Sequence, residues 1–508
     1  MKKGQIYAGL VKEMDFPNKG IVEIYNEETG RYEYALVKNA LPGQTVSFRV
    51  NKKRNGKAEG CLLSVEKPAK AERVATDVCA QKGMCGGCLY RGFPYGDTLK
   101  IKEKQVQKLL HEYINGEKYE APIFDGIFAS PETDGYRNKM EYTFGDEYKD
   151  GPMTLGLHKR GGFYDILDAD ECLIAGKDFG RIVEYTRDFF SQASVPYFHR
   201  VRHTGILRHL LVREAKKTGE ILLGLVTTSG EISGCEEGVS KQEIREWNPS
   251  LIRQWADGVK ALEGSLDGTF AGILHITNDT LADAINCDRL DILYGRDHFM
   301  EELLGLKFRI STFSFFQTNS LGAEVLYSKI REYLTEAKVN GTVFDLYSGT
   351  GTIAQLVAPA VSKVIGVEIV EDAVVQAREN AAINGLDNCE FIAGDVLKVL
   401  DQVEEKPDYI ILDPPRDGVN IKALKKIVAY GVEHIIYISC KASSLARDLE
   451  YLTEAGYRMV RWCMVDMFPW TGNVETVCLL SNTQKKKESY ITLDVDLDEF
   501  YRIKNGGK

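Results

Sequence analysis

A regular alternation of strand and helix patterns between residues 311 and 481 limits the fold of this chain more than any other feature. Helical stretches, such as 371–384 with an alanine every four residues, separate short apolar runs of strand composition. The runs cover residues 342–346, 363–368, 390–392, 409–412, 434–438, 459–465 and 476–480. They predict a doubly wound, Rossmann-like α/β sheet of seven strands, whose ligands bind beyond the carboxyl ends of the strands. We therefore expect the polar residues that follow the runs to meet at one edge.

A glycine-rich turn, Asp345-Leu-Tyr-Ser-Gly-Thr-Gly351, follows the first run. Gly349 and Gly351 allow a tight turn and a close approach of the backbone to a cofactor. Glu368 ends the second run, 19 residues past Gly349, where a carboxylate can bind both hydroxyls of a ribose. Asp395 follows the third run and can accept a hydrogen bond from an adenine amino group. The full Gly-x-Gly-x-x-Gly series is missing, which favours S-adenosylmethionine over NAD.

The later runs end in groups suited to methyl transfer. Asp413-Pro-Pro-Arg416 forms a rigid wall in which Asp413 can orient a cofactor or a base, and Arg416 stands where enzymes that methylate amines usually have an aromatic residue. Cys440 ends the fifth run and Glu475 begins the last. A thiolate is needed when the carbon to be methylated is a weak nucleophile, as carbon 5 of uracil is. The alternatives are a buried structural cysteine and a solvated glutamate.

A cysteine group lies in a glycine-rich loop. Cys79, Cys85 and Cys88 follow the spacing Cys-x5-Cys-x2-Cys, which allows the thiolates to share a metal centre with a fourth ligand. Spacing alone leaves zinc, an iron–sulfur cluster and buried structural thiols open. The eleven cysteines are irregularly spaced and no export signal precedes them. This pattern predicts a cytoplasmic protein without a disulfide framework, and no run is apolar enough for a membrane span.

The N-terminal residues 1–66 combine short strands with turns and predict a small OB-like β-barrel. Lys52, Lys53, Arg54 and Lys57 are expected on a loop that contacts phosphate, or on an ordinary solvated turn. The whole chain has a net charge of −10, but residues 1–120 carry 21 Lys and Arg against 15 Asp and Glu. A locally basic surface therefore remains compatible with nucleic acid.

The segment from 67 to 310 predicts a mixed α+β domain. Within it, Arg137-Asn-Lys139 lies between Tyr136 and Tyr142. Basic residues interleaved with aromatic residues are suited to phosphate contact and base stacking, and a solvated strand edge explains them equally well. The histidines of this segment have no metal-ligand spacing.

Several of these motifs together resemble the bacterial RNA (uracil-5-)methyltransferases, over residues 1 to about 481. The motifs are Phe316-Gln-Thr-Asn319, the turn 345–351, Leu412-Asp-Pro-Pro-Arg416, Ile438-Ser-Cys-Lys441 and Met467-Phe-Pro-x-Thr-Gly-x-x-Glu475. The stretch around 39–46 resembles a TRAM domain, a small RNA-binding barrel. The 23S rRNA branch of the family is the more similar one, because it has both a TRAM domain and a cysteine cluster.

The resemblance implies roles for individual residues. Cys440 would be the nucleophile and Glu475 the general base. Gln317, Tyr347, Glu368 and Asp413 would contact S-adenosylmethionine, with Gly349 in the turn and Asp395 at the adenine. A 4Fe–4S cluster would be held by Cys79, Cys85, Cys88 and Cys172.

The expected organisation is a TRAM barrel at 1–66, a central RNA-binding domain with the cluster at 67–310 and a methyltransferase domain at 311–481. No role is assigned to residues 482–508. We expect a cytoplasmic monomer that methylates carbon 5 of a uridine in 23S rRNA through a covalent Cys440 adduct. The alternatives are a tRNA uridine-5 methyltransferase, a non-catalytic RNA-binding assembly factor and a radical enzyme. The cysteine spacing differs from the Cys-x3-Cys-x2-Cys of radical enzymes.

Overall fold

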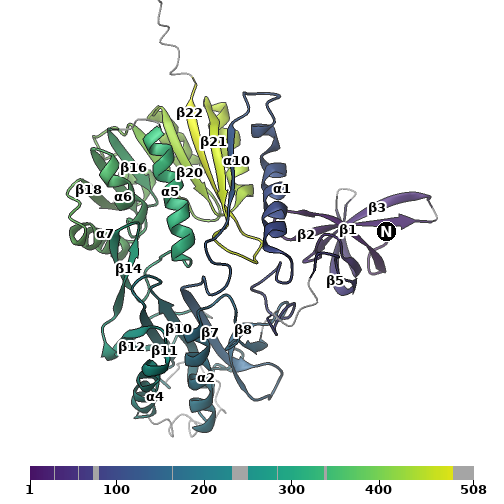
Figure 1. Ribbon diagram of the computed structural model, residues 1–508, viewed down its shortest axis with the longest axis vertical. Coiled ribbons are helices and arrows are strands. Elements are labelled where there is room, and N and C mark those ends of the chain that lie inside the picture. The colour runs from purple at the N-terminus through teal and green to yellow at the C-terminus, as the bar shows by residue number, and fades with distance from the viewer. Residues whose placement is uncertain are drawn as a thin grey trace, which may run out of the picture.

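The computed structural model describes residues 1–27, 29–54, 57–72, 79–162, 164–230, 250–282, 284–336 and 340–483. Figure 1 shows a small barrel beside a larger body, whose lower part is the central domain and whose upper part carries the C-terminal sheet. Residues 484–508, most of the unassigned C-terminal tail, lie outside the described residues. Among the described helices, none combines the length and apolar character needed to cross a membrane.

The N-terminal part is a closed barrel with the strand order β1-β2-β3-β5-β4, which confirms the predicted small β-barrel. Its strands are β1 (Ile6–Asp15), β2 (Lys19–Asn26), β3 (Arg31–Lys38), β4 (Thr45–Arg54) and β5 (Lys57–Lys67). Successive side chains of a strand alternate between its two faces, and the inward ones, including Val22, Val37 and Phe48, are fully buried. Lys52 and Lys53 are exposed and lie within β4, not on a loop as expected.

The central part is built on a seven-stranded sheet with the order β13-β12-β11-β10-β7-β8-β9. Its elements are β7 (Lys139–Asp146), β8 (Met153–His158), β9 (Ile166–Asp168), α2 (Lys177–Gln192), β10 (Leu207–Glu214), β11 (Glu220–Thr227), α4 (Ser250–Ala261), η1 (Leu262–Ser265), β12 (Thr269–Thr277) and β13 (Arg289–Gly295). Apolar residues of α2 and α4 pack against this sheet. A hairpin of β14 (His298–Leu303) and β15 (Leu306–Ser311) leads to the last part.

The C-terminal part is built on an eight-stranded sheet with the order β18-β17-β16-β19-β20-β22-β21-β6. Its strands are β6 (Ile123–Phe128), β16 (Thr342–Leu346), β17 (Lys363–Glu368), β18 (Cys389–Ala393), β19 (Tyr409–Leu412), β20 (His434–Ser439), β21 (Tyr457–Val465) and β22 (Glu475–Asn482). The helices are α1 (Tyr95–Ile114), α5 (Ser320–Glu336), α6 (Thr352–Val357), η2 (Ala358–Ala360), α7 (Glu371–Ile383), α8 (Val396–Val399), α9 (Ile421–Ala429) and α10 (Ala442–Glu454).

All seven runs of the sequence form strands of this sheet, and an eighth strand joins them. Strand β6 pairs in parallel with β21, although it comes from the segment assigned to the central domain. Helix α1 comes from the same segment and packs against α10 and β21. The sheet therefore uses residues 95–128 as well as 311–481. Only β22 is antiparallel to its neighbours, so the carboxyl ends of β16 to β20 lie at one edge.

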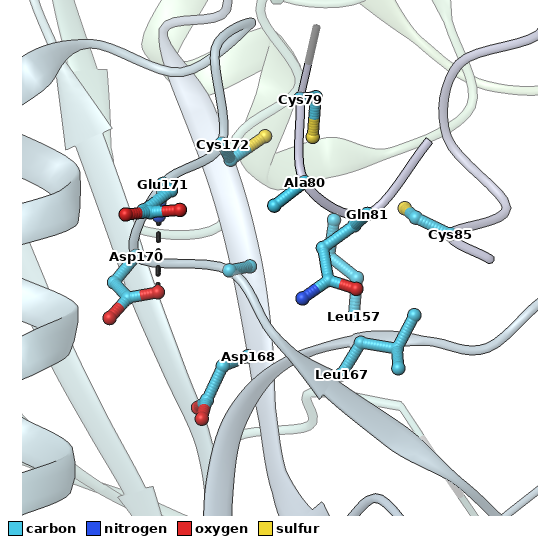
Figure 2. A pocket seen from close by; sticks show the side chains of 11 residues that line it. Cys79, Ala80, Gln81, Cys85, Leu157, Leu167, Asp168, Asp170, Glu171 and Cys172 are labelled. Atoms are coloured by element: carbon cyan, nitrogen blue, oxygen red, sulfur yellow. Dashed lines mark hydrogen bonds between the residues drawn. The ribbon is translucent and has the colours of Figure 1, made fainter. Parts of the chain in front are cut away.

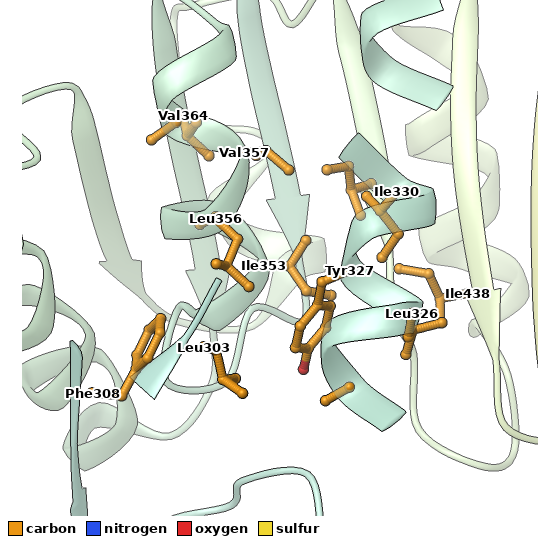
Figure 3. Close-up of a cluster of buried hydrophobic side chains, with 14 of the residues drawn as sticks. Leu303, Phe308, Leu326, Tyr327, Ile330, Ile353, Leu356, Val357, Val364 and Ile438 are labelled. Atoms are coloured by element: carbon orange, nitrogen blue, oxygen red, sulfur yellow. The ribbon is translucent and has the colours of Figure 1, made fainter. Parts of the chain in front are cut away.

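Helices α5 and α6 are held on the sheet by a layer of buried apolar side chains, which Figure 3 shows. Leu326 and Ile330 of α5 belong to one cluster with Ile353 and Leu356 of α6, and all four have almost no exposed surface. Burying one such side chain contributes roughly 1.5–3 kcal/mol. Tyr327 belongs to the same layer, with its hydroxyl at the margin of the apolar cluster. The layer thus fixes the start of α5 near the ends of the strands.

Candidate active site

The glycine-rich turn between β16 and α6 has the tight geometry that the sequence predicts. Gly349 and Gly351 have φ values of +54° and +71°, and a Cβ on Gly351 would lie 2.5 Å from the ring of Phe391. Tyr347 also has a positive φ, +68°, which is uncommon for a bulky residue and typical of functional sites. The turn therefore folds tightly at the edge of the sheet and leaves no room for a side chain at position 351.

Two acidic residues stand beside this turn. The Glu368 carboxylate accepts hydrogen bonds from the Gly349 and Val370 backbone N–H groups, each at 2.9 Å. Asp395 accepts one from the Leu397 N–H at 2.9 Å and caps α8. Burial and the nearby Asp395 raise the pKa of Tyr347 to about 12. The predicted residues at the ends of β16, β17 and β18 are thus neighbours.

A second group gathers at the ends of β19 and β20 and the start of β22. Burial, then the Glu475 and Asp413 carboxylates, raise the pKa of the Cys440 thiol to about 11, and a hydrogen bond from Arg416 opposes this shift. Burial and Asp413 raise the pKa of Glu475 to about 8. Burial alone raises the pKa of Asp413 to about 7. Four side chains from distant positions in the chain therefore share one electrostatic environment.

Buried groups that the sequence reasoning missed connect the two sets. Asp345 is fully buried, and burial and Asp413 raise its pKa to about 8. One of its oxygens accepts a hydrogen bond from the Ala354 N–H at 2.9 Å. Burial, Asp413 and Glu475 raise the pKa of Tyr327, which hydrogen-bonds with Gln317. The sequence offered a signal for Asp345, which is the first residue of the turn motif. It offered none for Tyr327, which has the pattern of an ordinary core residue of α5.

The segment that carries Gln317 is fixed by the central domain. Asn138 Nδ2 donates to the Gln317 carbonyl at 2.9 Å and to Ser320 Oγ at 2.8 Å, and the Asn138 N–H donates to the Thr318 carbonyl at 2.9 Å. For the run around Asn138, the sequence left RNA contact and a solvated strand edge as alternatives. Tyr136 and Tyr142 are 1% and 0% exposed, so neither ring can stack on a base.

The four predicted metal ligands lie around two adjoining cavities of about 40 and 30 Å³. Cys79, Cys85 and Cys172 line the larger one, which Figure 2 shows, and Cys88 joins them around the smaller. The Gly87 N–H donates to Cys85 Sγ at 3.3 Å. The spaces are too small for a nucleoside and suit a compact group.

The four cysteine thiols can be compared with the ligands of a metal centre. Within the described ranges, no three His, Cys, Asp or Glu side chains are close enough together to hold a metal ion. Burial and the neighbouring thiols, Cys172 first, raise the pKa of Cys88 to about 12. A metal cation between the thiols would instead lower their pKa, because cysteine binds metals as the thiolate. Both zinc, which needs sulfurs at about 2.3 Å, and an iron–sulfur cluster take thiolate ligands.

Comparison with known proteins supports this picture of the fold. Residues 291–483 match the protein-family model described as tRNA (uracil-5-)-methyltransferase. An uncharacterised RNA methyltransferase of Caldanaerobacter subterraneus subsp. tengcongensis is 42% identical over 483 residues, covering 95% of this chain and 100% of the relative. An uncharacterised RNA methyltransferase of Clostridium tetani is 43% identical over 479 residues, covering 94% of this chain and 98% of the relative.

One solved structure is similar over nearly the whole molecule. It is the Pyrococcus abyssi tRNA (uracil-54, C5)-methyltransferase in complex with S-adenosyl-L-homocysteine, with a TM-score of 0.68. The similarity covers 93% of this chain and 100% of that one, at 24% sequence identity. At this identity the likeness establishes the fold.

Proposed function

The chain belongs to the tRNA (uracil-5-)-methyltransferase family of RNA methyltransferases, and from this premise we propose that it methylates carbon 5 of a specific uridine in 23S rRNA, with S-adenosylmethionine as the methyl donor. One observation carries the reaction: Cys440, Glu475 and Asp413 are neighbours at the carboxyl edge of the sheet. A thiol beside a buried carboxyl is the pair that addition to a pyrimidine ring and later removal of its proton require.

In this mechanism the target uridine first leaves its base stack. The Cys440 thiolate adds to carbon 6, so that carbon 5 becomes an enolate-like nucleophile and takes the methyl group. Glu475 then removes the proton from carbon 5, the carbon 5–carbon 6 double bond re-forms and the thiolate leaves. The thiol is protonated at neutral pH in the resting site, and the charge of Arg416 and a hydrogen bond from it lower the pKa of the thiol, so Arg416 would stabilise the thiolate.

The methyl donor would be held by Gln317, Tyr347, Glu368 and Asp413, with Gly349 in the turn and Asp395 at the adenine end. When bound, S-adenosylmethionine supplies an electrophilic methyl group and a positive sulfonium charge. The buried Asp413, with its pKa raised to about 7, would be ionised by such a charge nearby. The Glu368 carboxylate already accepts two backbone hydrogen bonds in the turn, which orients it for ribose hydroxyls.

We assign 23S rRNA as the substrate because a barrel and a four-cysteine site occur together in this chain. A tRNA is the second candidate, because the Pyrococcus abyssi protein of the same fold is a tRNA (uracil-54, C5)-methyltransferase. Unmodified 23S rRNA fragments should be methylated well ahead of unmodified tRNA, as measured by donor-methyl incorporation and mapping of 5-methyluridine. Efficient methylation of tRNA with inert rRNA would overturn the substrate and leave the chemistry standing.

The barrel offers a surface suited to single-stranded RNA. Tyr25, Tyr32 and Tyr34 are 55%, 59% and 53% exposed, and the register of β2 and β3 places them on one face. The rings of Tyr25 and Tyr32 are 5.2 Å apart. The exposed Lys52 and Lys53 lie on the same barrel. Aromatic faces stack on bases and lysines neutralise phosphates, so the two sets of residues would make separable contributions to binding.

Substitutions on the barrel should therefore change RNA binding in two distinct ways. Tyr25→Ala with Tyr32→Ala should weaken affinity by about 1–3 kcal/mol per stacked base, with little change in salt dependence. Lys52→Ala with Lys53→Ala should weaken affinity and flatten the slope of log K against log salt by up to about 2. Titrations at several salt concentrations measure both. If log K against log salt had the same slope in both double variants, the tyrosines and lysines would not have the separate roles of base stacking and phosphate contact.

The cysteine site should contain iron after anaerobic preparation. We assign Cys79, Cys85, Cys88 and Cys172 to a 4Fe–4S cluster that supports the surrounding loops, with no catalytic step routed through it. The protein should be brown and contain about four irons per chain. Cys172→Ser should lower the iron content, whereas Cys287→Ser, at an exposed cysteine away from the cavities, should not. Stoichiometric zinc without visible absorbance would contradict the assignment.

A further inference from the structure

The loop between β21 and β22, residues 466–474, leads directly into Glu475 and is bound to other parts of the chain along most of its length. The Asn319 side chain donates to the Met467 carbonyl at 3.0 Å, and Tyr136 donates to the Pro469 carbonyl at 3.1 Å. The Asp466 N–H donates to the Phe128 carbonyl at 2.8 Å. We call residues 466–474 the base loop, since its last residue precedes the proposed general base.

Trp470 is the central anchor of the base loop. Its carbonyl accepts hydrogen bonds from the Leu89 and Tyr90 N–H groups, at 2.7 and 2.9 Å. Its indole N–H donates to the Thr133 carbonyl at 2.8 Å, and the Arg91 guanidinium lies 4.9 Å from its ring. Trp470 has a φ of +66°, a strained conformation that persists only where the surroundings hold it.

The residues that hold Trp470 adjoin the cysteine site. Leu89 and Tyr90 directly follow Cys88 in the chain. The Trp470 ring forms a buried cluster with Tyr136 and Ile174, and Cys88 and Cys172 pack against that cluster. Two of the four cysteines therefore share a small apolar core with the base loop.

A second anchor holds the start of the base loop. Asp466 and Lys102 form an ion pair of 2.6 Å, and both side chains are 0% exposed. Lys102 Nζ also donates to the Phe468 carbonyl at 3.1 Å, and the Tyr95 hydroxyl donates to Asp466 at 3.0 Å. Tyr95 and Lys102 lie in α1, which begins seven residues after Cys88. A buried ion pair with satisfied partners is well suited to fix one arrangement of a loop.

We propose that Trp470 is a positioning residue through which the cysteine site sets the location of Glu475. An ordered cysteine loop keeps the Leu89 and Tyr90 N–H groups on the Trp470 carbonyl and so keeps the strained base loop in place. When the cysteine loop becomes less ordered, the strained backbone of Trp470 relaxes. Glu475 then leaves the position from which it reaches the proton on carbon 5. The inference rests on the proposed function only for the role of Glu475, because the link between the loops is a property of the fold.

Hydrogen exchange tests the link without any assay of activity. Anaerobically prepared wild-type protein is compared with Cys88→Ser and with wild-type protein after metal removal. Both treatments should speed exchange at least about tenfold in peptides covering 89–90 and 466–475, and leave the peptides of β10 and β11 unchanged. Unchanged exchange in 466–475 after loss of the cysteine centre would overturn the proposal, whatever the enzyme methylates.

A substitution at Trp470 tests the consequence for catalysis. Trp470→Phe should lower kcat roughly 10–100-fold, because small displacements of a catalytic group have effects of this size. KM for the donor should stay within about twofold and the iron content should be unchanged. The specific signature is accumulation of a denaturation-resistant protein–RNA adduct, since methyl transfer would still occur and only proton removal would fail. Trp462→Phe is the matched control, because Trp462 is buried in β21 and stacks on Phe124.

The outcomes separate this inference from a merely structural role of Trp470. A general loss of packing would lower stability and donor affinity together and leave no adduct. Wild-type kcat and adduct level in Trp470→Phe would overturn the proposal. If the wild-type protein methylates no uridine, the proposed function fails, and the exchange experiment still decides whether the two loops are linked.

Discussion

RNA that contains 5-fluorouridine at the target position should form a denaturation-resistant complex with this protein in the presence of S-adenosylmethionine, and the Cys440→Ala variant should form none. Fluorine cannot leave as a proton does, so the adduct at carbon 6 would be trapped after methyl transfer. On normal RNA, Cys440→Ala should lose methylation by ~10⁴-fold or more, as nucleophile deletions commonly do. Gel electrophoresis under denaturing conditions and methyl incorporation measure the two effects.

Cys389→Ala is a suitable control for this experiment. Cys389 begins β18 in the same sheet, so it lies at the amino end of a strand, at the opposite edge from Cys440. The control should form the trapped complex at the wild-type level. Residual methylation by Cys440→Ala well above the blank would show that the nucleophile is another group.

Glu475→Gln should separate methyl transfer from product release. The amide keeps the shape of the side chain and cannot accept the proton of carbon 5, so turnover should fall about 10²–10⁴-fold. Normal uridine RNA should then remain attached to the protein through Cys440, already methylated. Mass spectrometry of the adduct detects the methyl group. Normal turnover would assign proton removal to a different residue, and an unmethylated adduct would show that Glu475 is needed before or during methyl transfer.

The pH dependence of the wild-type enzyme should reflect the same carboxyl. Burial and Asp413 raise the pKa of Glu475 to about 8, so at pH 6 the free enzyme holds it in the protonated form, which cannot act as a base. The value of kcat/KM should therefore increase as pH rises from 6 to about 8.

The raised pKa of Glu475 has the opposite effect on the stability of the fold, which should decrease as pH rises. A carboxyl with a raised pKa in the folded state binds more protons than in the unfolded state between about pH 4.5 and 8, so its contribution to stability declines as pH rises through this window.

The sequence by itself was sufficient to predict much of the C-terminal sheet. The bounds of β16, β17 and β19 agree with the predicted runs to the residue, because each strand is a short β-branched run ended by a turn or a charged residue. The glycine turn was predictable for the same reason, since positions 349 and 351 need positive φ values that glycine adopts freely. The expected meeting of polar groups at one edge follows from the parallel order of the strands, and Cys440, Glu475 and Asp413 are indeed neighbours there.

Only the tertiary structure could decide which distant segments join. Strand β6 completes the sheet beside β21, more than 300 residues away in the chain, although the sequence analysis assigned its residues to the central domain. Tyr136 and Tyr142, which the sequence left between an RNA contact and a solvated strand edge, are buried, and Asn138 between them holds the segment of Gln317. Local patterns predict strands, turns and candidate ligands, because these depend on neighbours in the chain. Burial and long-range partners, such as the Lys102–Asp466 pair and the setting of Trp470, depend on how the whole chain packs, and no local pattern records them.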